Sequence, residues 1–336
     1  MSIDNSPIKL GILGAGSFIQ RRILPALKDI PSIQVMCLYK QDDQSATKVA
    51  AQFGIPYAVS SKKELIDHRE VEAVLVATPN HCHEGDAIMC AKAKKPTLCE
   101  KPLAPTTDAI IRMQENFTKY NIPLLVGHSL RFKPAILKAK EFLEGGFLGD
   151  LYHIRAYFTL QVPATNWRNK KSYGGGVLQD VGVHLIDLIQ FLSGENISSI
   201  QAISDQNYNR ASEKSEVSVT SMGKLTNGAF FSFECSMNQP LQSGFEVIGT
   251  KSRLVSKHSL RQTNDSKELF YHILEDDSEV SILLQKNNIY VDELTHFANV
   301  IKGKEYSIIN SDVGLCNQRI VEAAYESIHK REMILC

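Results

Sequence analysis

The stretch KLGILGAGSFIQ, from Lys9 to Gln20, decides the fold that we predict for this chain of 336 residues. The apolar run Lys9–Leu13 reads as a strand and ends in Gly14-Ala15-Gly16, and a stretch of helical character follows through Leu27. A buried strand that turns through glycines into a helix is the opening unit of a strand–helix–strand repeat. The sequence therefore predicts that more such units follow.

The same alternation continues to residue 127. Four further strands are expected at Ile33–Tyr39, Ala73–Ala77, Thr97–Cys99 and Leu124–Val126, with helical stretches between them. The run AVLVA at Ala73–Ala77 is apolar throughout, as expected of a strand buried on both faces of a parallel sheet. Because crossovers between parallel strands are right-handed, residues 1–127 are predicted to form an α/β domain with a doubly wound parallel sheet.

The pattern changes in residues 128–336, which we predict to be a second, α+β domain. Strand-like runs separated by turn residues predict a largely antiparallel sheet. These runs are Tyr152–Gln161, Glu216–Leu225, Ala229–Ser236, Gly244–Gly249, Arg253–Ser256, Leu269–Leu274 and Val280–Leu284. Two helices, Tyr290–Ile301 and Asp312–His329, are expected to close the chain.

The composition limits the partners of this chain. Lys plus Arg equals Asp plus Glu, at 37 each, so no long-range positive field attracts nucleic acid or an anionic membrane. The seven cysteines are scattered and form no C-x-x-C pair, which favours a reducing compartment. No run is long and apolar enough to span a bilayer, and the N-terminus does not resemble a secretory signal. We therefore expect a cytoplasmic protein.

The glycine turn is a candidate binding site for a dinucleotide pyrophosphate. Glycines allow close approach of the backbone, and the helix that follows offers free N–H groups and a partial positive charge. The expected contact residues are Gly14, Gly16, Ser17, Phe18 and Ile19. Since Ile19 stands where a third glycine is usual, an ordinary strand-to-helix turn is the alternative.

Lys40 bears on the choice between NAD and NADP. It follows the second strand, where an acidic residue usually binds the ribose hydroxyls of NAD. A cation there is able to pair with the 2′-phosphate of NADP, which gives NADP a slight preference. A solvated lysine at a strand end is the alternative.

Two longer stretches carry a family resemblance. They are ATPNHCHEGDAIMCAKAKKPTLCEKPL, residues 77–103, and GGGVLQDVGVHLIDLIQFLSG, residues 174–194. Together they resemble the glucose–fructose oxidoreductase / inositol dehydrogenase / MocA (Gfo/Idh/MocA) family, with its A-T-P-N-x-x-H, E-K-P and D-x-G-x-H motifs. VGHSLRF, residues 126–132, is similar to the family segment that joins the domains. Lys94-Lys95, where the family often has Gly-Lys, departs from the pattern, as do Ile19 and Lys40.

The resemblance implies a Rossmann domain, an open-faced sheet domain and a homodimer or homotetramer. It implies hydride transfer between NAD or NADP and a carbinol carbon of a sugar, inositol or sugar derivative. Lys101, Asp180 and His184 would be the catalytic residues. The residues that would line the cofactor, besides Lys101 and the glycine turn, are Thr78, Pro79, Asn80, His83 and Glu100. Trp167 and Arg168 are expected to cover the site, although a surface loop is an equal alternative.

The chemistry of these residue types agrees with that role. Oxidation of an alcohol needs a base near neutrality and a cation to stabilise the developing alkoxide. His184 has a suitable intrinsic pKa, and Lys101 is able to donate hydrogen bonds to the oxygen. Asp180 and His184, four residues apart, would share one face of an apolar helix. A structural hydrogen-bonded pair in the core is the alternative.

Other readings of the sequence stay open. The donors of Asn80-His81-Cys82-His83 are adjacent rather than spaced for tetrahedral coordination, so no metal site is expected. Glycosidases that use bound NAD transiently, and regulators that bind a dinucleotide without turnover, share the predicted fold. The joint presence of Lys101, Asp180 and His184 favours an oxidoreductase, because a regulator does not need all three.

Overall fold

The computed structural model describes residues 6–163, 168, 170–205, 213–261 and 268–336. The chain forms two compact units. Unit 1 comprises residues 1–128 and 290–315, and unit 2 comprises residues 129–289 and 316–336. Of the described residues, no helix is both long and apolar enough to cross a membrane.

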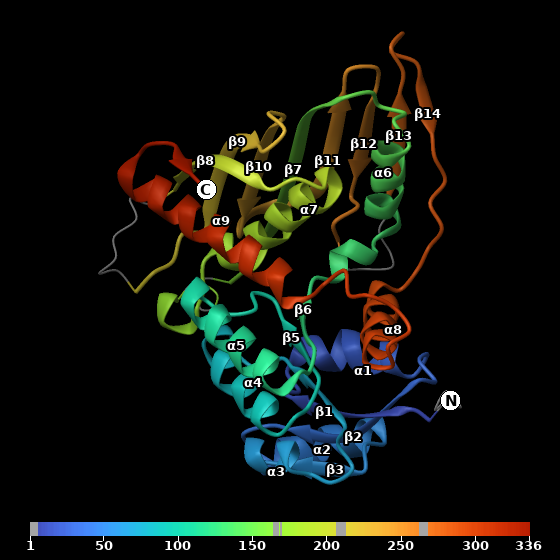
Figure 1. Ribbon diagram of the computed structural model, residues 1–336, viewed down its shortest axis with the longest axis vertical. Helices are drawn as coiled ribbons and strands as arrows, with labels where there is room; N and C mark the ends of the chain where they lie inside the picture. The colour runs from blue at the N-terminus through green and yellow to red at the C-terminus, as the bar shows by residue number, and fades with distance from the viewer. Residues whose placement is uncertain (1–5, 164–167, 169, 206–212, 262–267) are drawn as a thin grey trace. The chain divides into compact units, whose positions relative to one another are not determined.

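Unit 1 contains a six-stranded parallel sheet in the order β3-β2-β1-β4-β5-β6 (Figure 1). The strands are β1 (Ile8–Leu13), β2 (Ile33–Tyr39), β3 (Tyr57–Val59), β4 (Ala73–Val76), β5 (Thr97–Glu100) and β6 (Leu124–Gly127). β1 and β4 lie at the centre and are almost wholly buried. This sheet confirms the α/β prediction for the N-terminal part of the chain, and the order reverses beside β1, as in a doubly wound fold.

Helices connect the strands of unit 1. They are α1 (Leu24–Leu27), α2 (Asp43–Phe53), α3 (Lys62–Ile66), α4 (His83–Lys92) and α5 (Thr107–Tyr120), with a π-helical segment η1 (Ile19–Ile23) and a 3₁₀ turn η2 (Asn80–Cys82). Local sequence sets their ends. The Asp42 carboxylate accepts from the Ser45 amide at 2.8 Å to begin α2, and Gly54 ends the helix in the left-handed conformation.

The segment 290–315 returns to unit 1. It contains most of α8 (Ile289–Ile301), and the Ile309 carbonyl accepts from the Val126 amide of β6 at 2.9 Å. Residues far apart in the chain thus complete one unit.

Unit 2 contains a nine-stranded sheet in the order β14-β13-β12-β11-β7-β10-β9-β8-β15. Its strands are β7 (Leu151–Gln161), β8 (Ile197–Ser204), β9 (Ser218–Leu225), β10 (Phe230–Ser236), β11 (Asn238–Gly249), β12 (Arg253–Lys257), β13 (Leu269–Ile273), β14 (Glu279–Ser281) and β15 (Ile334–Leu335). β7 and β10 run parallel and the other pairs run antiparallel, so the prediction of a largely antiparallel sheet is confirmed.

The helices of unit 2 include one long buried element. They are η3 (Ser129–Phe132), α6 (Pro134–Glu144), η5 (Lys171–Tyr173), the π-helical η6 (Leu178–Gly182), α7 (Val183–Ser193) and α9 (Ser311–Lys330), whose first turn belongs to unit 1. η6 continues into α7, which packs on β7 and α6. Most of α7 is apolar, and this accounts for its burial.

Candidate active site

The glycine turn of unit 1 leaves room at its outer side. Gly14 has φ +100°, and a Cβ atom there would lie 2.5 Å from the Ala77 carbonyl oxygen, so the conformation and the close packing both require glycine. The amides of Gly14 and Ala15 donate to the Tyr39 carbonyl at 3.2 Å. A Cβ atom on Gly16 would meet nothing within 4 Å. The turn therefore fits a phosphate group at Gly16, where backbone is open to approach.

The residues after the turn leave less space for a bound phosphate group than Gly16 does. The Ile19 side chain is 1% exposed and occupies the core where the motif usually has a third glycine. Phe18 packs edge-to-face on Tyr290 of α8, with ring centroids 5.6 Å apart. Ser17 is exposed, and its carbonyl accepts from the Arg21 side chain at 3.3 Å.

A lysine ammonium group lies against the turn. Lys40 follows β2, and its Nζ donates to the Ala15 carbonyl at 3.3 Å, beside a 2.9 Å bond from Gln20. The structure thus places a cation at the end of the second strand, near the backbone that a dinucleotide would approach.

A buried carboxylate holds the segment after β4. Asp86 of α4 is 3% exposed and accepts from the Thr78 hydroxyl at 2.7 Å. It also accepts from Lys62 Nζ at 2.6 and 2.9 Å. The orientation of Thr78 is therefore determined by an ion pair between α3 and α4, while Asn80 is buried in the same segment.

His83 connects two segments that carry predicted site residues. Its imidazole is 1% exposed, with Nδ1 2.9 Å from the Pro102 carbonyl oxygen and Nε2 2.9 Å from the Thr78 carbonyl oxygen. Burial lowers the pKa of the ring, and the two carbonyls oppose this shift. Since Pro102 directly follows Lys101, His83 ties the loop after β5 to the loop after β4.

Two glutamates lie close together at the carboxyl end of the sheet. Glu100 ends β5 and packs on Gly127, where a Cβ atom would lie 3.1 Å from the Glu100 carboxylate. Glu293 of α8 is 1% exposed. Burial, together with the nearby Glu100, raises the pKa of Glu293 well above its usual value. Burial and the neighbouring carboxylate thus both favour the protonated form of Glu293, beside the residue that precedes Lys101.

Unit 2 contributes a second set of predicted residues. The Arg168 guanidinium pairs with the Asp180 carboxylate at 2.9 Å, while His184 is 3% exposed on α7. Asp180 lies in the π-helical η6, so the α-helical spacing assumed for Asp180 and His184 does not apply throughout. π-Helical turns occur frequently at functional sites. Trp167, predicted to cover the site, lies outside the described residues.

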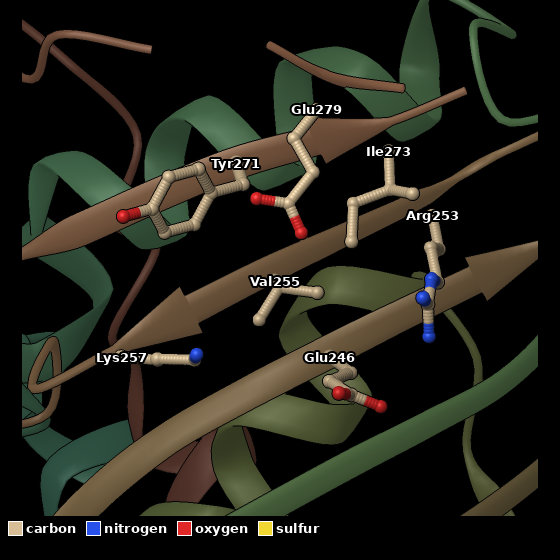
Figure 2. Close-up of a pocket in the computed structure, with 7 residues that line it drawn as sticks. All are labelled: Glu246, Arg253, Val255, Lys257, Tyr271, Ile273 and Glu279. Atoms are coloured by element: carbon tan, nitrogen blue, oxygen red, sulfur yellow. The ribbon is translucent and has the colours of Figure 1, made fainter. Parts of the chain in front are cut away.

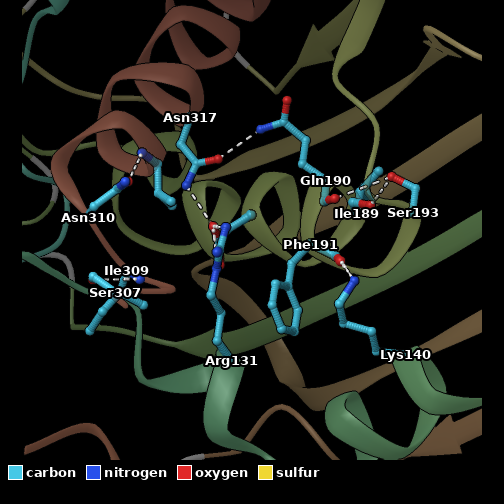
Figure 3. Close-up of polar contacts among 12 residues, drawn as sticks. Arg131, Lys140, Ile189, Gln190, Phe191, Ser193, Ser307, Ile309, Asn310 and Asn317 are labelled. Atoms are coloured by element: carbon cyan, nitrogen blue, oxygen red, sulfur yellow. Dashed lines mark hydrogen bonds and ion pairs between the residues drawn. The ribbon is translucent and has the colours of Figure 1, made fainter. Parts of the chain in front are cut away.

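A charged network fixes α7 (Figure 3). The Arg131 guanidinium makes a forked contact to Asp187, with Nη2 2.7 Å from Oδ1 and Nε 2.9 Å from Oδ2. Asn317 donates to the same carboxylate at 2.9 Å and accepts from Gln190 at 2.9 Å. Arg131 also stacks 4.6 Å from the Phe191 ring centroid. The helix that carries His184 is thus held from η3 and α9.

These features accompany matches to known proteins. Residues 8–128 match the model of an oxidoreductase family with an NAD-binding Rossmann fold, and residues 136–255 match the GFO/IDH/MocA C-terminal domain. The chain belongs to the Gfo/Idh/MocA oxidoreductase family. The resemblance predicted from the sequence is confirmed.

Curated members of the family include sugar dehydrogenases and reductases. The chain is 25% identical over 297 residues to 1,5-anhydro-D-fructose reductase of Ensifer adhaerens, a match that covers 87% of this chain and 88% of that protein. It is 34% identical over 164 residues to levoglucosan dehydrogenase of Pseudarthrobacter phenanthrenivorans. That match spans 47% of this chain and less than half, 42%, of the relative.

Solved structures share the fold. Aldose-aldose oxidoreductase of Caulobacter crescentus has a TM-score of 0.90 at 22% identity and covers 98% of this chain and 100% of its own. A levoglucosan dehydrogenase complex with NADH and levoglucosan has a TM-score of 0.87 at 23% identity, covering 98% and 99%. A 3-ketoreductase of Actinomadura kijaniata, in complex with NADP, has a TM-score of 0.87 at 21% identity, covering 96% and 98%. Both nicotinamide dinucleotides thus occur on this fold.

A polar pocket of about 250 Å³ lies on the sheet of unit 2 (Figure 2). Its lining residues come from neighbouring strands in register: Glu246, Arg253, Val255, Lys257, Tyr271, Ile273 and Glu279. None of them was predicted as a site residue. Its charged lining consists of two acidic residues, Glu246 and Glu279, and two basic residues, Arg253 and Lys257.

The structure shows residues around the predicted site that the sequence motifs do not single out. Asp86 bonds to Thr78 and pairs with Lys62, and Glu293 lies near Glu100, but none of these three neighbours belongs to the motifs. Asp86 was recognisable in principle, because it lies three residues after His83 on one helix. Glu293 was not, since its neighbour Glu100 is far away in the sequence.

Proposed function

We propose that this chain is an NAD(P)-dependent dehydrogenase or reductase that acts on a CH–OH group of a sugar, inositol or sugar derivative. The open backbone at Gly16, beside the Lys40 ammonium group, is the observation that carries the cofactor assignment. A bound nicotinamide supplies or accepts the hydride. The protein has to bind the substrate, exclude water and move the proton of the hydroxyl group.

Three residues are proposed for that proton chemistry. In the oxidative direction, the hydroxyl proton leaves to His184 while the protonated Lys101 stabilises the developing charge on oxygen. Alternatively, the neutral amine of Lys101 takes the proton itself and becomes the ammonium group that stabilises the oxygen. Asp180 would orient the groups around it, with Arg168 held at 2.9 Å. His83 and Asp86 would fix the loops that carry Lys101 and Thr78.

NADP is proposed as the slightly preferred cofactor. Lys40 is the support for this choice, because its ammonium group is able to pair with a 2′-phosphate. The NADP complex of a related structure and the NADH complex of another show that the fold itself does not decide the preference.

A spectrophotometric screen tests the proposed function. Sugars, inositols and ketosugars are offered with NAD(H) and NADP(H), and nicotinamide absorbance at saturating substrate is followed. Substrate-dependent oxidation or reduction is expected with at least one compound. Dinucleotide binding without any turnover would favour a regulator, and bond cleavage without a net absorbance change would favour a glycosidase that uses NAD transiently.

We also propose a cytoplasmic homodimer or homotetramer. All seven cysteines are free thiols, which suits a reducing compartment. The sheet of unit 2 exposes Ile203, Met222 and Phe230 on β8, β9 and β10, and a second copy would cover such apolar side chains. Light scattering of the purified protein tests the assembly: Met222→Lys should give monomers, and an unchanged mass would exclude this face as the interface.

A further inference from the structure

A buried glutamate holds the turn that leads into the η6–α7 helix. Glu216 is 4% exposed, and its Oε1 accepts from the Leu178 amide at 3.0 Å and from the Tyr325 hydroxyl at 2.9 Å. Its backbone carbonyl accepts from the Val177 amide at 3.1 Å. Main chain and side chain of one residue thus bind two successive amides, and every group involved belongs to unit 2.

The glycine run of this turn is shaped by the same carboxyl group. Gly176 has φ +125°, and a Cβ atom there would lie 2.6 Å from Glu216 Oε1 and 2.8 Å from the Tyr325 hydroxyl. The Gly176 carbonyl in turn accepts from the Asp180 amide at 3.0 Å. A short chain of contacts therefore runs from Glu216 through Gly176 and Leu178 to Asp180.

The charges around Glu216 offer it no compensation. Among the residues that the structure describes, no Lys, Arg or His forms an ion pair with it, and Asp205 and Cys235 are its neighbouring acidic groups. Burial raises its pKa to about 7, although the bonds from Leu178 and Tyr325 oppose the shift. A buried carboxyl without a cation costs free energy, so packing alone does not account for a glutamate at this position.

Both protonation states serve the same geometry. Both side-chain bonds end on Oε1, so a proton on Oε2 leaves both of them in place. The geometry of the turn is therefore preserved on either side of neutral pH.

We propose that Glu216 is a positioning residue for the catalytic helix, setting the Gly174–Leu178 turn and through it the place of Asp180. This inference rests on the proposed function, in which Asp180 and His184 take part in the chemistry. Glu216 would not touch substrate or cofactor. It would act by fixing the start of the element that carries both residues.

Two variants separate the acceptor from the charge. Glu216→Gln keeps the size and the Oε1 acceptor, whereas Glu216→Met removes the acceptor at similar length. Hydrogen exchange of the full-length protein, which needs no substrate, reports the Leu178 amide. We expect at least about tenfold faster exchange at Leu178 in Glu216→Met and little change in Glu216→Gln. Unchanged exchange in Glu216→Met would overturn the proposal.

Kinetics distinguish positioning from general support of the fold. With a substrate from the screen, Glu216→Met should lower kcat about tenfold or more while the NADH dissociation constant stays within about twofold. Glu216→Gln should keep kcat close to that of the unmodified protein. Equal loss in both variants, or loss of NADH affinity together with kcat, would contradict a positioning role.

Tyr325→Phe covers the case in which Glu216→Met does not fold. It removes one of the two donors to Oε1 and should accelerate exchange at Leu178 by about fivefold, while the amides of β9 stay protected. No acceleration there would also overturn the proposal. Failure of the proposed function is separate, since it would show as absence of turnover in the unmodified protein.

Discussion

At the scale of single residues, three buried titratable groups of this protein lie against backbone groups or against another carboxylate. His83 lies between two carbonyl oxygens, Glu216 accepts from a backbone amide, and Glu293 lies near Glu100. Such groups resist substitution because burial makes an unmatched polar atom costly. Their pKa shifts make stability depend on pH.

Glu216→Gln tests that dependence. The pKa of Glu216 is raised from 4.5 to about 7 in the folded protein, so the folded state binds more protons than the unfolded state between these values. The free energy of unfolding therefore falls as pH rises through this window, by up to about 3 kcal/mol for this one group. Urea unfolding at pH 5 and pH 8 should show a smaller fall in Glu216→Gln than in the unmodified protein. Glu115→Gln, at an exposed position, serves as the control. The same fall in the free energy of unfolding between pH 5 and pH 8 in all three proteins would refute the raised pKa of Glu216.

Lys40→Asp tests the cofactor preference. Replacing the cation beside Ala15 by an acid should weaken binding of NADPH by about tenfold or more and leave NADH binding equal or stronger. Fluorescence titration with both reduced cofactors measures the two constants. Arg69→Asp, an exposed change elsewhere in unit 1, controls for altered net charge. An equal change in the dissociation constants of both cofactors would mean that Lys40 does not bind the 2′-phosphate.

Residue types in short motifs were sufficient to identify the family and to nominate Lys101, Asp180 and His184. The partners of these residues were not predictable in the same way. Glu216 acts on Leu178 from a segment 38 residues later, and such a pairing depends on the packing of strands rather than on local spacing. Which residue bonds to a buried side chain is therefore decided by tertiary structure.

At the scale of elements, the first strand, its glycine turn and the helix after it act as one unit. Gly14 is required by backbone conformation and packing, whereas Gly16 is required only if something approaches it. Gly14 is thus needed for folding, whereas Gly16 is needed only for binding.

Gly16→Ala tests this separation. Its added methyl group meets no protein atom within 4 Å, so the thermal midpoint should stay within about 2 °C, but the dinucleotide dissociation constant should rise about tenfold or more. Gly85→Ala on α4, equally open, is the matched control and should bind as before. Unchanged affinity in Gly16→Ala would place the phosphates elsewhere.

The fork between Arg131 and Asp187 makes α7 sensitive to a single change. Arg131→Met should lower the free energy of unfolding by about 3 kcal/mol, because it leaves the Asp187 carboxylate buried without its cation. Lys138→Met, which breaks an exposed pair with Glu141, should cost less than about 1 kcal/mol. Denaturant unfolding compares the two. A loss for Arg131→Met as small as the control would show that the network does not hold the helix.

Strong periodicity made most elements predictable, and its absence explains those that were missed. β8 (ISSIQAIS) was not predicted, since serines and glutamine interrupt its apolar residues. The strand forms because its edges pair with β9 and β15. The π-helical turn η6 also escaped prediction, because the sequence of a π-turn differs little from that of an α-helix.

At the scale of the whole molecule, each unit contributes part of the proposed chemistry. Unit 1 contains Lys101 and the glycine turn, and unit 2 contains Asp180 and His184. The return of residues 290–315 to unit 1 brings Glu293 near Glu100, although the order of the sequence gives no sign of it. The order of the sequence suggests two consecutive domains. In the structure, long-range pairing such as that of Val126 with Ile309 decides which segments belong to each unit.

Turnover of Lys101→Met is the most direct test of the central claim that this chain performs nicotinamide-dependent redox chemistry through Lys101. The variant keeps the length of the side chain and removes its charge and its donors. With the best substrate from the screen, kcat should fall about a thousandfold or more, while the NADH dissociation constant stays within about twofold of the unmodified protein. Turnover that survives nearly intact in Lys101→Met would contradict the account.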